Sequence, residues 1–170
     1  YARGEVHQTL SPAMDIQVAS NFERFLYYHF EQDSDSLVRF MQEFAANGAA
    51  SIGAPPDTQL MSSVAVNRKD TLAAMHEVNR QYGYVLDPHT AVGYHAARNH
   101  LDQQVVSTDV VVVATAHPAK FPDAVQQATG GEPTHPTLEA LKGLPMRRHA
   151  LPCDIDAVKA YLVEQLHSQP

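Results

Sequence analysis

A run of four valines, Val110–Val113, is the feature that most constrains the fold of this chain. The run is β-branched, too short for a helix and apolar on both faces, which is typical of a central strand in a parallel sheet covered on both sides. Pro118 or Pro122 suits the first turn of a following helix, which Gly130–Gly131 would end. Since ligands of open α/β sheets bind beyond the carboxyl ends of the strands, Thr115 is expected to meet a ligand.

Helical spacing dominates the chain before residue 49. The first predicted helix begins at Ser20, which forms a capping box with Glu23. The second helix has Asp35 as its candidate N-cap and ends at Asn47–Gly48. The aromatic residues of both helices are most simply a packing face.

Helices and short apolar runs alternate in the rest of the chain. Asn67 is predicted to cap a helix that ends near Tyr82–Gly83, and Asp87 a helix that starts at Pro88. Asp154 is expected to cap a final amphipathic helix. The other predicted segments are a loop over residues 53–57, a candidate short strand over 60–66, a brief apolar run over 84–86, a linker over 132–136, a short helix over 137–141 and a candidate edge strand over 149–151.

This alternation predicts an α/β fold, namely a partial doubly wound parallel sheet with a mainly helical N-terminal part. We divide the chain into a helical segment, residues 1–60, and an α/β part, residues 61–170. The sheet has too few strands to be complete. The chain begins at Tyr1 without an initiator Met, a signal peptide or a transit stretch, which is typical of a piece of a longer polypeptide.

Composition excludes several classes of function. The formal net charge is −7, and the twelve Lys and Arg are scattered apart from Arg147–Arg148, which argues against a nucleic-acid-binding face. No apolar stretch approaches the roughly 18 residues of a membrane span. The ten His residues and the single Cys153 form no pair with metal-ligand spacing, so no metal is predicted. A lone Cys suits a reducing cytoplasm.

Three motifs carry a resemblance to a known family. They are Thr9–Ile16 (TLSPAMDI) followed by Ser20–Arg24 (SNFER), Asp87–Gly93 (DPHTAVG) and Ala114–Phe121 (ATAHPAKF). Together they resemble the C-terminal part of threonine synthase, in the family's order, and they cover residues 9–125. The resemblance implies a pyridoxal-phosphate (PLP) enzyme of the tryptophan-synthase-β-like fold, fold type II. Such enzymes convert O-phospho-L-homoserine and water to L-threonine and phosphate.

The resemblance also implies roles for individual residues. Thr115, with Ala116, would bind the cofactor, because fold type II enzymes place a Ser or Thr hydroxyl against the pyridine nitrogen. Such a hydroxyl donates a hydrogen bond without favouring the protonated ring, as a carboxylate would. The alternative is that the Thr115 hydroxyl only caps the following turn.

Other residues are candidates for binding substrate or forming the pocket wall. Asp87 is also explained as an N-cap, and His89 could steer an acid–base step or bind phosphate. Arg24 suits a phosphate or carboxylate, or else a surface ion pair. The complete set of these candidates is Ser11, Asp15, Asn21, Arg24, Asp87, His89 and Lys120.

In the family, a Lys from the N-terminal half forms the Schiff base with PLP. None of the four Lys here lies in such a segment, so this chain contains no predicted catalytic residue and should be inactive without that half. Two other functions stay open, a threonine synthase-like phospho-lyase and a non-catalytic interaction or assembly module using the helical pair 20–48. Exposed sheet edge and apolar surface would favour self-association.

Overall fold

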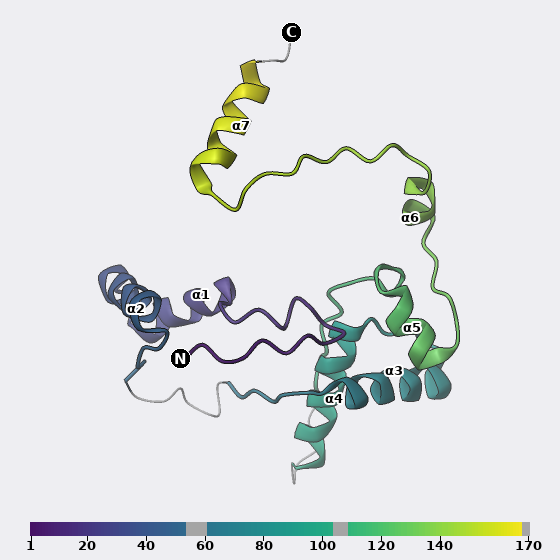
Figure 1. Cartoon of the computed structure of the whole chain (residues 1–170). Helices are drawn as coiled ribbons and strands as arrows, with labels where there is room; N and C mark the ends of the chain where they lie inside the picture. The colour runs from purple at the N-terminus through teal and green to yellow at the C-terminus, as the bar shows by residue number, and fades with distance from the viewer. Residues whose placement is uncertain (54–60, 104–108, 168–170) are drawn as a thin grey trace. The chain divides into compact units, whose positions relative to one another are not determined.

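The computed structural model describes residues 1–53, 61–103 and 109–167, and the regular secondary structure of these residues consists of helices joined by irregular segments (Figure 1). By contacts between Cα atoms the chain forms two units, Tyr1–His135 and Pro136–Pro170. The first unit contains α1 (Ser20–His29), α2 (Ser34–Asn47), α3 (Arg68–Tyr82), α4 (Pro88–Asp102), the 3₁₀ helix η1 (Pro118–Lys120) and α5 (Pro122–Thr129). The second unit contains α6 (Pro136–Leu141) and α7 (Ile155–His167).

The predicted sheet is absent from the described residues, where β-pairing is limited to one isolated bridge between Ala2 and Ala49. Val110–Val113 is not a strand, and Val111 and Val113 are 86% and 71% exposed, so the expectation of a buried central strand is wrong for this chain. Residues 61–66, 84–86 and 149–151 are not strands either. A strand exists only where a neighbouring strand accepts and donates its backbone hydrogen bonds, and the described residues supply none beside the valines.

Most helix ends agree with the predictions. Asn67 and Asp87 cap α3 and α4 with their side chains, Pro88 is the first residue of α4, and Asp154 accepts from the N–H groups at the start of α7. Helices α2, α3 and α5 end at glycines in the left-handed region, where a residue without Cβ avoids a steric clash. Both predicted proline starts are used, because Pro118 begins η1 and Pro122 begins α5.

Two N-caps were predicted at the wrong residue. Helix α1 is capped by Ala19 without a side-chain hydrogen bond, so Ser20 and Glu23 form no capping box. Helix α2 is capped by Asp33, whose carboxylate accepts from the Asp35 N–H at 2.9 Å. Both Asp33 and Asp35 precede the apolar face, and spacing alone did not separate them.

Two apolar clusters lie in the first unit. One joins α3, the N-terminus of α4 and α5, and its fully buried side chains include Met75 and Val125. The other joins α1 and α2 through Leu26, Phe40 and Phe44, with Tyr1 packed against it. The aromatic residues of the helical pair therefore form a packing face, as predicted.

The proposed division after residue 60 remains a prediction, since Leu60 and most of the 53–57 loop lie outside the described residues. The short helix predicted over 137–141 is confirmed by α6. Within the described part of the chain, no helix combines the length and apolarity needed to cross a membrane.

Candidate functional site

The first motif folds into a turn held by its own side chains. The Asp15 carboxylate accepts hydrogen bonds from the Thr9 N–H at 2.8 Å and the Thr9 hydroxyl at 2.7 Å. The Thr9 hydroxyl oxygen in turn accepts from the Ser11 N–H at 3.0 Å, and the Met14 N–H donates to the Ser11 carbonyl at 2.8 Å. Both carboxylate oxygens of Asp15 therefore hold the turn together, because they accept hydrogen bonds that a backbone carbonyl would accept in an ordinary turn.

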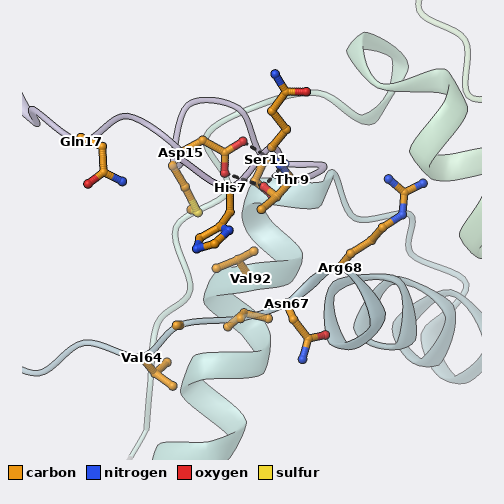
Figure 2. A pocket seen from close by; sticks show the side chains of 13 residues that line it. His7, Thr9, Ser11, Asp15, Gln17, Val64, Asn67, Arg68 and Val92 are labelled. Atoms are coloured by element: carbon orange, nitrogen blue, oxygen red, sulfur yellow. Dashed lines mark hydrogen bonds between the residues drawn. The ribbon is translucent and has the colours of Figure 1, made fainter. Parts of the chain in front are cut away.

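This turn borders a cavity of about 720 Å³, shown from close by in Figure 2. Segment 64–68, with Val64 and Asn67 labelled in the view, and Val92 of α4 line other parts of it. Ser11 also lines this cavity, is only 2% exposed, and has a hydroxyl that finds no hydrogen-bond partner among the described residues. An unpaired buried hydroxyl is rare in folded proteins, so Ser11 is an unusual feature of this wall.

The second motif forms the N-terminus of α4. Asp87 is 2% exposed, and its carboxylate accepts from the backbone N–H groups of His89 at 2.9 Å and Thr90 at 3.4 Å, and from the Thr90 hydroxyl. The His89 ring atom Nδ1 lies 3.2 Å from the same carboxylate. The predicted N-cap role of Asp87 is therefore confirmed, and Asp87 also contacts the His89 ring.

The third motif meets the second at a cavity of about 390 Å³. Thr115 lines it together with His89, Met14 and the small residues of α4, among them Gly93. The Thr115 hydroxyl bonds to no residue in the described part of the chain, and the turn after it is capped instead by Nδ1 of His117, which accepts from the Ala119 N–H at 3.1 Å. The alternative that Thr115 caps this turn is therefore wrong.

Two contacts tie the three motifs together across long stretches of sequence. The Ala13 N–H donates to Nε2 of His89 at 3.4 Å, although the two residues are 76 positions apart. The His89 ring also packs against Phe121, with 4.9 Å between ring centroids. Thus Thr9–Ile16, Asp87–Gly93 and Ala114–Phe121 meet around His89.

The remaining candidates lie apart from this cavity. Arg24 lines a different hollow of about 410 Å³ beside Tyr27 and Tyr28, and Asn21 is an exposed residue of the same helix, α1. Lys120 is exposed in η1, and Ala116 is half-buried beside Thr115. None of the described residues that line the Thr115 cavity is a Lys or Arg.

His117 is not among the site residues predicted from the sequence, although its position directly before Pro118 is a recognisable N-cap pattern. A polar residue directly before a proline that begins a helical turn is the same pattern as Asp87–Pro88. The His117 imidazole accepts a hydrogen bond from the backbone N–H two residues further on, as the Asp87 carboxylate does at the start of α4. The Thr115 hydroxyl is therefore not needed to cap this turn.

Several known proteins that are similar in sequence or in structure are threonine synthases. A family model described as "Threonine synthase, C-terminal" matches residues 90–162. Threonine synthase from Pseudomonas aeruginosa is 36% identical over 169 residues, which cover 95% of this chain and 35% of the relative. The chain therefore spans about a third of the length of this curated relative.

Two solved structures are also similar. PLP-bound threonine synthase from Brucella melitensis matches with a TM-score of 0.79 at 36% identity, over 100% of this chain and 36% of the other. The yeast enzyme matches with a TM-score of 0.74 at 28% identity, over 99% of this chain and 38% of the other. The chain is therefore similar in sequence and in structure to threonine synthases, and the matching family model identifies residues 90–162 with the C-terminal part of these proteins.

Proposed function

We propose that this chain is the C-terminal part of a PLP-dependent threonine synthase, which converts O-phospho-L-homoserine and water to L-threonine and phosphate. The observation that carries the proposal is the meeting of three motifs, distant in sequence, around the cavity that Thr115 lines. The similarity to threonine synthases, one of them with PLP bound, supports the same conclusion.

The residues present fit PLP at one end of the cofactor. Thr115 offers a hydroxyl that no described residue occupies, in the lining of a cavity whose other residues are mostly small or apolar, with His89 and His100 among them. When bound, PLP supplies an electron sink for the carbanions formed on the substrate. Thr115 would donate its hydroxyl proton to the pyridine nitrogen, and Ala116 would lie beside it. A hydroxyl suits this position because it can donate a hydrogen bond without holding the ring in its charged form.

The rest of the pocket would come from protein outside this chain. O-phospho-L-homoserine carries a phosphate and a carboxylate, yet the described residues lining the Thr115 cavity include no Lys or Arg. Arg24, Asn21 and Lys120 remain proposed substrate contacts that need other parts of the enzyme to bring the substrate to them. With the Schiff-base Lys also outside this chain, the chain alone is expected to be inactive.

The exposed valines also support a role for protein outside this chain. Val111 and Val113 are large apolar side chains in water, and such residues gather where another segment packs. We expect Val110–Val113 to become a central strand when the preceding part of the enzyme pairs with it. Without that part the chain should self-associate, and a monodisperse monomer in sedimentation velocity would contradict this expectation.

The decisive experiment uses the full-length protein that contains this chain. It should bind PLP, seen by absorbance, and should release phosphate from O-phospho-L-homoserine with equal formation of threonine. Thr115→Val, which keeps the shape but removes the hydroxyl, should lower kcat/KM about tenfold or more, as the loss of about 1.4 kcal/mol of hydrogen bonding would. Thr115→Ser is the matched control and should stay near wild type.

Three results would contradict the proposal. Phosphate release without threonine would indicate a threonine synthase-like phospho-lyase. Failure to bind PLP would indicate a non-catalytic interaction module. Equal activity of Thr115→Val and Thr115→Ser would remove Thr115 from the cofactor site.

A further inference from the structure

His89 lies where the three motifs meet, and both of its ring nitrogens have a partner. Nδ1 lies 3.2 Å from the Asp87 carboxylate, and Nε2 accepts from the Ala13 N–H at 3.4 Å. The residue is 7% exposed, and Phe121 packs against the ring. The imidazole is therefore enclosed by contacts on both sides.

These two partners determine the tautomer. A carboxylate only accepts, so Nδ1 must carry a proton. A backbone N–H only donates, so Nε2 must present a lone pair to Ala13. With both contacts in place, His89 is the neutral Nδ1–H form, because the bond made by one ring nitrogen sets the state of the other.

We infer that His89 is a positioning residue and not an acid–base catalyst: oriented by Asp87, it holds the Ser11–Asp15 turn in place, so that Met14 of the turn forms part of the wall of the Thr115 cavity. The Nε2 lone pair already accepts a hydrogen bond from the Ala13 N–H, and the Nδ1–H already donates one to the Asp87 carboxylate. Neither nitrogen is left to exchange a proton with a substrate. The effect on the reaction, which rests on the proposed function, is exerted through the position of the turn.

The Ala13 contact joins the turn to α4, and Leu10, just before the turn, packs against the core cluster that includes Ala91 of α4. Asp15 and Thr9 hold the turn's internal shape, but both belong to the turn itself. The bond from Ala13 to His89 joins that shape to the helix that lines the Thr115 cavity. Met14, the next residue, lines both cavities and would move with Ala13.

The amides Gln and Asn separate the two roles of the ring. In His89→Gln the side-chain oxygen stands near the position of Nε2 and can still accept from Ala13. In His89→Asn the amide stands near the position of Nδ1, so it keeps the Asp87 contact and loses the Ala13 contact. Neither amide transfers protons near neutral pH, so both variants lack any acid–base function.

The test is made in the full-length protein loaded with PLP. We expect His89→Asn to raise KM for O-phospho-L-homoserine about fivefold, with kcat within twofold, as for the loss of one hydrogen bond. His89→Gln should recover most of that loss. If His89 were an acid–base catalyst, both variants would instead lose about 10²- to 10⁴-fold in kcat, and the inference would be overturned.

A second readout does not depend on activity. Imidazole ¹⁵N shifts of histidine-labelled protein should show His89 as the Nδ1–H tautomer, with His89→Gln identifying its signals by their disappearance. An Nε2–H tautomer or a charged ring at neutral pH would overturn the inference. Absence of threonine formation in the wild type would instead refute the proposed function and leave the tautomer result to decide the role of His89.

Discussion

Replacing Asp87 with Ala should be far more destabilising than the loss of an ordinary helix cap. The Asp87 carboxylate is buried and accepts from two backbone N–H groups, the Thr90 hydroxyl and the His89 ring. Removing a capping side chain costs about 1 kcal/mol. Each buried donor left without an acceptor costs a further 1–3 kcal/mol or so, not fully additively. We expect a total of about 4 kcal/mol, a large part of the roughly 5–15 kcal/mol stability of a domain.

The matched control is Asn67→Ala at the start of α3. Asn67 is exposed, its Oδ1 accepts from the Asp70 N–H at 2.9 Å, and its amide group donates to the carboxylate of Asp70 at 2.7 Å, so its loss should cost about 1 kcal/mol. A second variant, Asp87→Asn, retains a good capping residue and one carbonyl oxygen, so it should lie between the two. The three variants therefore have a defined order.

The assay is urea unfolding of the full-length protein, followed by far-UV circular dichroism, with the transition midpoint and slope fitted for each variant. We expect Asp87→Ala to be the most destabilising of the three variants. Asp87→Asn should be less destabilising than Asp87→Ala and at least as destabilising as Asn67→Ala. If Asp87→Ala unfolds at the same urea concentration as Asn67→Ala, the buried hydrogen bonds at Asp87 contribute nothing beyond capping, and the reasoning is refuted.

Three further predictions concern single positions. Gly93→Ala places a Cβ 3.3 Å from the half-buried side chain of Val112, which we expect to shift by a few tenths of an ångström. Helix propensity should then add up to about 1 kcal/mol of stability in thermal unfolding, and a loss would show that Val112 is rigid. Ser11→Ala removes a buried hydroxyl that has no partner in the described part of the chain and should leave the urea midpoint unchanged or raised, whereas a marked decrease would reveal a partner elsewhere. The Ser36 hydroxyl, donating to Asp33, holds the pKa of that carboxyl below its usual 3.8, so the contribution of Asp33 to α2 should be present above 3.8 and lost as pH falls through the lower folded-state value. A carboxyl NMR titration midpoint at or above 3.8 would contradict this last prediction.

Much of the helical structure could be read from neighbouring residues. Asp87–Pro88 and Asn67 predict where helices begin, and Gly83 predicts where one ends, because caps form between residues two to four positions apart. The failures were also local, since Asp33 and Asp35 satisfy the same cap pattern two positions apart. The family motifs further pointed to Thr115, although its role toward a cofactor stays a proposal.

Tertiary structure alone decided which of these segments meet. The hydrogen bond from Ala13 to His89 spans 76 positions, and no local pattern in either segment predicts it. The same limit explains the valines: a β-branched run shows that a segment suits a strand, but a strand also needs a neighbour to complete its backbone hydrogen bonds. Val110–Val113 has the composition of a buried strand without such a neighbour among the described residues, and three of its four valines are exposed. Local chemistry sets helix ends and turns, whereas pairing and pocket geometry depend on which distant parts of the protein are present.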